Sequence, residues 1–259
     1  RIPSEQLLQD FDIVKKAYTQ LHPGLYRYND EAAMERHFRA LERALGEDLT
    51  LREAYLAFSK FLGKIRCGHT YANFYNQNGL VKAVILNQPD KLPFAHRLVD
   101  RRLIITRNGS ENERLERGTE ILAVNGVSVA QILDSLLLVV KSDGTNDAKR
   151  LYDLQVQGYD TYEAFDVYFP LFFPPRDGKY ELQVRDLNSG EAFQTSVAAL
   201  TRGERLARLE ERYGPLPASY DDLWSFRILD EKTAYLQLGT FVVWNMEMDW
   251  KAFLKNAFR

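Results

Sequence analysis

Cysteine is almost absent from this chain of 259 residues. Cys67 is the only one, so no disulfide can form within the chain, and a lone cysteine does not indicate an oxidising or reducing compartment. The chain also lacks an excess of one charge, since 34 basic and 36 acidic residues give a formal net charge of −2. This balance gives no electrostatic reason to expect nucleic acid or an anionic membrane as a partner.

Long hydrophobic runs are missing as well. The longest candidate, ILDSLLLVV at residues 132–140, is much shorter than a membrane span and contains an aspartate. The chain starts at Arg1 with neither a methionine nor a signal-like apolar segment, and it stops at Arg259 inside a helical pattern. We therefore expect a piece of a longer protein from which any targeting segment has been removed, and we expect no membrane span within this piece.

Several motifs that carry chemistry are not found. No H-x-x-x-H, C-x-x-C or clustered His/Asp set predicts a metal site, and no glycine-rich loop predicts phosphate binding. No G-x-S-x-G elbow supplies a serine nucleophile. The sequence therefore predicts neither a metal ion nor a cofactor.

The first third of the chain has the apolar period of helices. A first helix, with Ser4 as its expected N-cap, is predicted to end at Pro23–Gly24. A second helix is expected to begin after Asp30, which is a good N-cap residue.

A third helix has the clearest start signal. Thr50 and Glu53 have the spacing of a capping box, in which each side chain satisfies a free backbone amide of the first turn. We expect Gly68 to end this helix in the left-handed conformation. His69 would then be the first residue past a helix stop.

His69 is the one histidine of four that this pattern places in an exposed, fixed position. An imidazole titrates near neutral pH, so it can accept a proton and return it as a general base. The residues alone favour a simpler alternative, a helix-terminal histidine whose charge interacts with the carbonyl end, worth roughly 0.3–1 kcal/mol. His22 is expected to belong to the helix stop and His37 to pack partly buried on the second helix, while His96 receives no role.

Beyond the third helix, the period changes to the alternation of strands. A short strand at residues 69–75 is expected to lead into a hairpin turn at Asn78–Gly79, and Asn125–Gly126 is a second tight turn. Further strands are predicted within residues 96–107, 119–126, 179–187 and 191–200, with a helix at 127–140 and a mostly helical, aromatic-rich insertion at 146–173.

The last part of the chain is predicted to begin with a solvated, charged helix. RGERLARLEERYG, residues 202–214, has this character, and Pro215 with Pro217 reads as a linker. Two apolar strands at 223–229 and 233–241 then precede a helix, which suggests the opening of an α/β layer.

Three short motifs follow one another along nearly the whole chain. A Gly-His-Thr motif ends the helical part, an l-x-x-G-x-x-I-x-x-V-N-G pattern follows, and a Tyr-Leu-x-Leu/Ile-x-x-Phe strand comes late. In this order they resemble the tail-specific (C-terminal-processing) and tricorn-like serine peptidase family. The matching residues are Gly68, His69, Thr70, Leu115, Gly118, Ile121, Val124, Asn125, Gly126, Tyr235, Leu236, Leu238 and Phe241.

The resemblance implies an α+β multidomain protein. Residues 1–76 would form an N-terminal three-helix subdomain, and residues 77–202 a PDZ-like, β-rich domain with a helical insertion. Residues 203–222 would be a linker, and residues 223–259 the truncated start of an α/β peptidase core.

The resemblance also implies the N-terminal part of a serine endopeptidase that hydrolyses peptide bonds by acyl transfer. His69 would be the general base, while the nucleophilic serine and its acidic partner would lie beyond Arg259, so this piece alone is expected to be inactive. Two features depart from the pattern. Gly68 stands where tricorn-type members have a serine, and other members use a lysine base, which would also lie beyond Arg259.

The expected partner is a peptide or an unfolded protein, at the cell envelope, in the periplasm or outside the cell, and the family also allows a homo-oligomer. No substrate-binding residue is predicted. The LPF segment at 92–94 lies where a PDZ carboxylate loop is expected, but it lacks the usual glycines. The alternative function is a non-catalytic peptide-binding protein on the same scaffold.

Overall fold

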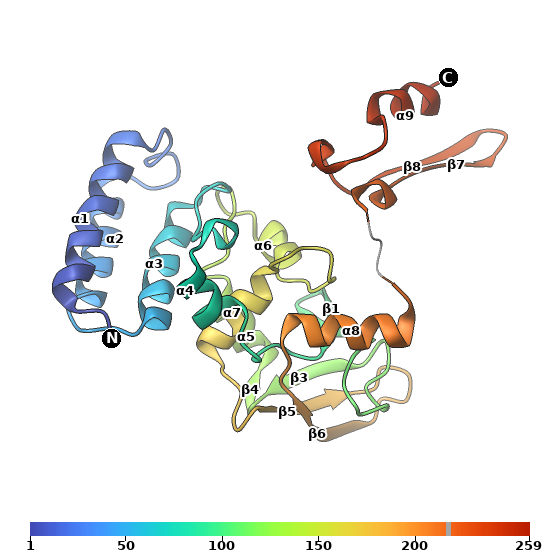
Figure 1. Ribbon diagram of the computed structural model, residues 1–259, viewed down its shortest axis with the longest axis horizontal. Helices are drawn as coiled ribbons and strands as arrows, with labels where there is room; N and C mark the ends of the chain where they lie inside the picture. Colours follow the sequence, from blue (N-terminus) through green and yellow to red (C-terminus); the bar gives the residue numbers. More distant parts are fainter. Residues whose placement is uncertain (216–218) are drawn as a thin grey trace. The chain divides into compact units, whose positions relative to one another are not determined.

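The chain folds into two compact units (Figure 1). The computed structural model describes residues 1–215 and 219–259, and it separates Arg1–Leu209 from Glu210–Arg259. Helices are combined with a six-stranded antiparallel sheet, which confirms a mixed fold of the α+β kind. Pro217, part of the expected linker, lies outside the described residues. In the described part of the chain, no helix is both long and apolar enough to cross a membrane.

The three predicted N-terminal helices are present as α1 (Ser4–Leu21), α2 (Glu31–Ala44) and α3 (Leu51–Ile65). Asp30 caps α2 by accepting from the amide of Ala33 at 2.6 Å, and Thr50 with Glu53 forms the expected capping box. The prediction for Ser4 was wrong. It is the first helical residue after the N-cap Pro3, and its amide donates to Asp48 Oδ1 at 2.9 Å.

The predicted end of α3 was also wrong. Arg66, and not Gly68, adopts the left-handed conformation after the helix, at a φ of 58°. Its carbonyl is fixed there, because it accepts from the amide of Gly144 at 2.9 Å. A tertiary hydrogen bond therefore ends the helix two residues earlier than local glycine preference suggests.

Residues 69–75 do not form the expected strand, and Asn78–Gly79 is not a hairpin turn. A turn leads into the 3-10 helix η1 (Phe74–Asn76), which is followed by α4 (Gly79–Val81) and the π-helix η2 (Lys82–Leu86). Asn78 acts as an N-cap, since its side chain accepts from the amide of Val81 at 3.0 Å. Asparagine favours helix caps as well as tight turns, so the local signal was ambiguous.

The predicted strands form one antiparallel sheet in the order β1-β2-β3-β5-β6, with β4 paired to β3. Its tight turns have the positive φ angles that short hairpins need, 50° and 60° at Asp100 and Arg101, and 49° and 81° at Asn125 and Gly126. The strands are β1 (Phe94–Val99), β2 (Arg102–Asn108), β3 (Glu120–Val124), β4 (Val127–Ser128), β5 (Lys179–Arg185) and β6 (Ala192–Ala198).

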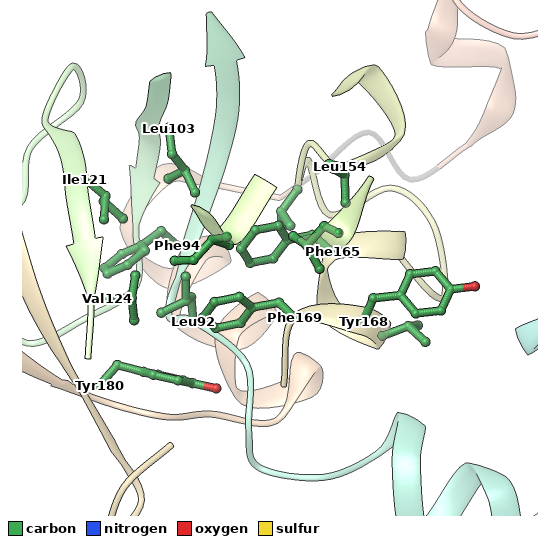
Figure 2. Close-up of a cluster of buried hydrophobic side chains, with 14 of the residues drawn as sticks. Leu92, Phe94, Leu103, Ile121, Val124, Leu154, Phe165, Tyr168, Phe169 and Tyr180 are labelled. Atoms are coloured by element: carbon green, nitrogen blue, oxygen red, sulfur yellow. The ribbon is translucent and has the colours of Figure 1, made fainter. Parts of the chain in front are cut away.

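Helices α5 (Val129–Leu136), α6 (Asp147–Asp153) and α7 (Ala164–Phe172) complete this part, as the helical insertion predicts. Aromatic rings from α7 pack against the sheet (Figure 2). Phe165 stacks on Phe169 with ring centroids 4.8 Å apart, and Phe169 lies 5.5 Å from Tyr180 of β5. Three aromatic residues of the predicted insertion, Phe165, Tyr168 and Phe169, are thus buried in this core.

The first unit contains two hydrophobic cores that share α3. Phe61 and Ile65 pack with α1 and α2 in the helical core, whereas Tyr55 belongs to the core under the sheet. Helix α3 thus links the N-terminal helices to the sheet. The domain boundaries expected at 76/77 and 202/203 stay predictions.

Helix α8 (Arg202–Tyr213) is not the solvated helix that its charges suggest. Arg205 is fully buried and pairs with Asp166 of α7, with Nη1–Oδ1 and Nη2–Oδ2 distances of 2.8 and 2.5 Å. Nη1 also donates to the carbonyl of Leu92, and Glu163 Oε2 lies 3.4 Å from Nη2. The guanidinium therefore ties α8 to α7 and to the start of β1.

One guanidinium faces two buried carboxylates here, and their pKa values move apart. Burial opposes ionisation of Asp166, but the bidentate contact with Arg205 holds its pKa below the usual value. Burial, with the neighbouring charge of Asp166, raises the pKa of Glu163 to about 7. Nearby, burial lowers the pKa of His96 to about 4. The imidazole of His96 therefore packs neutral against Phe165, with Nε2 3.1 Å from the carbonyl of Leu154.

The second unit consists of a hairpin, β7 (Trp224–Asp230) with β8 (Thr233–Leu238), the short helices η3 (Tyr220–Leu223) and η4 (Val243–Asn245), and α9 (Trp250–Ala257). Two strands followed by a helix agree with the sequence. The indole of Trp224 packs on Phe253 and donates to the carbonyl of Thr240 at 2.7 Å. That this unit opens a catalytic core stays a prediction.

Replacing Arg205 by alanine should destabilise the first unit strongly. The change leaves two buried carboxylates without their cation, which typically costs about 3–5 kcal/mol. Urea unfolding measures the difference. Arg208→Ala on the same helix is the matched control, because its pair with Glu111 at 3.7 Å is exposed and worth about 0–1 kcal/mol. Equal effects of the two changes would contradict a structural role for the buried ion pair.

The pH dependence of stability should reveal Glu163 and His96 as opposing groups. A pKa of about 7 for Glu163 makes the folded state bind more protons above the unfolded value of 4.5, so its contribution falls as pH rises between these values. His96 has the opposite effect, because its pKa is about 4 in the folded state and 6.5 in the unfolded state. Its contribution to stability therefore rises with pH between these two values. Wild-type stability should therefore be nearly flat from about pH 4.5 to 6.5, whereas Glu163→Gln should gain up to about 1.4 kcal/mol per pH unit. Chemical unfolding across this range tests the prediction, and parallel curves for the two proteins would contradict it.

Candidate functional site

His69 lies at the corner of the turn that follows α3. The amide of Thr70 donates to the carbonyl of Cys67 at 3.0 Å, which closes the turn and turns the imidazole outward. His69 is exposed while Thr70 is buried. The ring forms no hydrogen bond or ion pair within the described part of the chain, so both of its nitrogens are accessible to a ligand.

A pocket of about 970 Å³ adjoins this imidazole. One wall is the segment from the end of α1 to the loop before α2, and the other comes from the turn after α3 and from the loop after α5. The lining residues are Ala17, Tyr18, Leu21, His22, Pro23, Gly24, Leu25, Tyr26, Arg27, Tyr28, Cys67, His69, Thr70 and Asp143.

His22, the second histidine of the pocket, is fixed by contacts of its two ring nitrogens and of its ring face. Its Nδ1 accepts from the amide of Gly24 at 3.2 Å, so its proton lies on Nε2, which is 3.0 Å from Thr70 Oγ1. The ring of Tyr18 stacks on it with centroids 5.5 Å apart. Both nitrogens are thus occupied, and His22 belongs to the helix stop, as expected.

Asp143, from the loop after α5, fixes the backbone before His69. The amide of Gly68 donates to Asp143 Oδ1 at 2.9 Å. The neighbouring amide of Gly144 donates to the carbonyl of Arg66, so two hydrogen bonds join this loop to the turn. A Cβ on residue 68 would lie 2.8 Å from Asp143 Oδ2. The glycine before the histidine thus leaves room for a carboxylate against its Cα, and it does not serve as the left-handed helix stop.

The other residues of the motifs lie elsewhere. Leu115, Ile121 and Val124 are buried under the sheet, where Gly118 and Asn125–Gly126 make its turns. The segment at 92–94 is buried as well. The structure therefore does not bring the PDZ-type pattern to the pocket, and its PDZ-like identity stays a prediction.

Sequence reasoning missed most of the pocket. Asp143 carries no recognisable signal, because its partner is a backbone amide 75 residues earlier. The LHPGLYRY segment at residues 21–28 did carry a recognisable signal, namely a proline and a glycine among apolar and aromatic residues. Three of these side chains, Leu21, Tyr26 and Tyr28, are exposed. In the described ranges, no three His, Cys, Asp or Glu side chains come together as metal ligands would.

Together, fold and pocket define a mixed α/β protein that offers an exposed imidazole beside a cavity, with no serine among the lining residues. The sequence matches no protein family, and no curated protein is similar to it in sequence. Among the solved structures that share the fold are those of mature CPAF, the chlamydial protease-like activity factor, and of mature CPAF complexed with lactacystin. Each has a TM-score of 0.52 and 15% identity over 75% of this chain. The chain spans about a third of their length, 34%.

Removing the Asp143 carboxylate should loosen the turn that carries His69. In Asp143→Ala the amide of Gly68 loses a charge-assisted partner, and we expect its hydrogen exchange to become about tenfold faster or more. Asp143→Asn keeps an acceptor oxygen and should stay close to the wild type. Asp147→Ala, an exposed acidic position in the same region, is the control. Unchanged exchange in Asp143→Ala would show that the bond does not hold the turn.

Proposed function

We propose that this chain is the N-terminal part of a tail-specific or tricorn-like serine endopeptidase, with His69 as its general base. The observation that carries the proposal is the contrast between the two histidines of the pocket. Both nitrogens of His22 are occupied, whereas the imidazole of His69 is exposed on a turn whose backbone is fixed. A general base needs this combination of a free ring and a rigid support.

The fold shared with mature CPAF, a serine protease, supports a peptidase function in general. In the proposed mechanism, the hydroxyl of a serine beyond residue 259 attacks the peptide carbonyl, and His69 takes its proton. The imidazolium then gives this proton to the leaving amine, and water releases the acyl group by the reverse sequence. Such proton transfer contributes about 100- to 10,000-fold in rate.

The wider assignment is part of the same proposal. We place a PDZ-like domain at the antiparallel sheet and the opening of the peptidase core at the second unit, with peptides or unfolded proteins as substrates. A location at the cell envelope or outside the cell, and assembly as a homo-oligomer, are family expectations. No metal or cofactor is needed for the acyl-transfer chemistry.

A non-catalytic peptide-binding protein is the second candidate. The observation that favours it is the pocket itself, a cavity of about 970 Å³ with exposed apolar side chains in its lining. The sequence that follows in the parent protein separates the two candidates: a serine in a glycine-rich loop after a D-x-R strand favours the enzyme.

His69→Ala in the full-length protein should lower kcat by about 100- to 10,000-fold while leaving the fold intact. His69 is exposed and has no partner in the described structure, so circular dichroism and the unfolding midpoint should not change. Peptide hydrolysis measures kcat.

His37→Ala is the control, because His37 is half-buried on α2 and does not line the pocket. Unchanged turnover in His69→Ala would refute the assignment and favour a lysine base further along the chain. Equal losses in both variants would indicate a general effect on folding.

A further inference from the structure

The rim of the pocket gathers large apolar side chains that have no structural reason to be exposed. Leu21 is 79% exposed, Tyr26 48% and Tyr28 37%, and all three fall within the eight residues that start at the last residue of α1. Single exposed apolar residues are common on proteins, but several around one cavity mark a binding site.

The floor and the far side of the pocket are rigid. Leu25 is buried at 2% exposure, and the stacked pair of Tyr18 and His22 is anchored to Thr70. The ring of Tyr28 lies against the backbone of Gly144, since a Cβ there would come within 3.1 Å of it. The aromatic wall is therefore formed before a ligand arrives, which limits the entropy lost on binding.

We propose that this pocket binds a short segment of a peptide substrate through a large aromatic side chain, next to His69. The inference rests on the proposed function for the choice of a peptide as ligand. Tyrosine rings at the wall can stack with an aromatic side chain or meet it edge to face, which adds to the gain from burying its area.

The size and the charge of the pocket limit which ligands fit it. A volume of about 970 Å³ is large enough for a whole small ligand, so more than one residue of a peptide can enter. The lining carries one cation, Arg27, and one anion, Asp143, so it does not select for net charge. Arg27 moreover lies over the ring of Tyr28, 5.3 Å from its centroid.

The four histidines provide a direct measurement. His22 and His69 line the pocket, while His37 lies on α2 and His96 is buried on β1. Proton NMR of the imidazole rings during titration with N-acetyl-Ala-Phe-Ala-amide should show saturable shifts for the first two and none for the others. We expect a Kd of about 0.1–1 mM for so small a ligand.

The central residue of the peptide tests the chemical class. Peptides with alanine, aspartate or lysine in place of phenylalanine should bind at least about tenfold more weakly. Equal shifts with the alanine peptide would overturn the aromatic preference. Equally tight binding of free phenol would overturn the peptide assignment and indicate a site for small aromatic molecules.

Variants of the rim locate the binding energy. Leu21→Ala and Tyr26→Ala should each weaken binding about fivefold to tenfold without affecting folding, because both side chains are largely exposed. Ile13→Ala is the matched control, being 66% exposed on α1 but outside the lining. Equal losses in Ile13→Ala, or none in the rim variants, would overturn the proposal.

His69→Ala separates this inference from the proposed function. It should keep the affinity for the phenylalanine peptide within about twofold, because the rim and not the imidazole supplies the contacts. Suppose that the rim variants lose peptide binding while His69→Ala keeps its turnover. This result would refute His69 as the general base and would support the pocket as a peptide-binding site. If neither His22 nor His69 shows a saturable shift, peptide binding in the pocket is refuted. The role of His69 as general base would then be tested by the turnover of His69→Ala alone.

Discussion

Besides the bond between Thr70 and Cys67 that closes it, four hydrogen bonds to other segments hold the turn after α3, and the candidate site depends on them. They join the carbonyl of Arg66 to Gly144, the amide of Gly68 to Asp143, the hydroxyl of Thr70 to His22 and the carbonyl of Ala72 to Tyr55, over 2.9 to 3.0 Å. The partners come from the loop after α5, the end of α1 and α3 itself. Every second residue is fixed in this way, so the backbone of His69 is determined while its ring stays unpartnered.

These bonds are made possible by the double role of α3. Tyr55 belongs to the core under the sheet, and Phe61 with Ile65 to the core of the N-terminal helices. Close approach is also needed, and Gly63 provides it, because a Cβ there would come within 2.4 Å of the carbonyl of Leu138. The loop that carries Asp143 follows directly. A helix packed on two sides thus places the turn between the helical part and the sheet.

The sequence predicted what local interactions decide. The cap at Asp30 and the capping box at Thr50 depend on neighbouring residues only, and both are present. The turn at Asn125–Gly126 is present too, with the positive φ angles that these residue types favour locally. Where a distant partner decides, the predictions failed. The amide of Gly68 donates to the carboxylate of Asp143, which lies 75 positions later in the sequence. Arg205 is buried because it pairs with Asp166 of α7, which lies 39 positions earlier. Charge patterning alone cannot distinguish a solvated arginine from one whose partner lies on another helix.

The same distinction explains why the site was found only in part. His69 could be chosen from the sequence because a helix end and a glycine precede it, although the glycine serves another purpose than a helix stop. The fixed state of His22 could not be foreseen, since its partner Thr70 lies 48 residues later. Yet the value of His69 as a candidate rests on that contrast. Of two imidazoles in one pocket, the one without structural duties is the one that can change its protonation state without disturbing the fold, and a base that must charge and discharge in every cycle requires this independence.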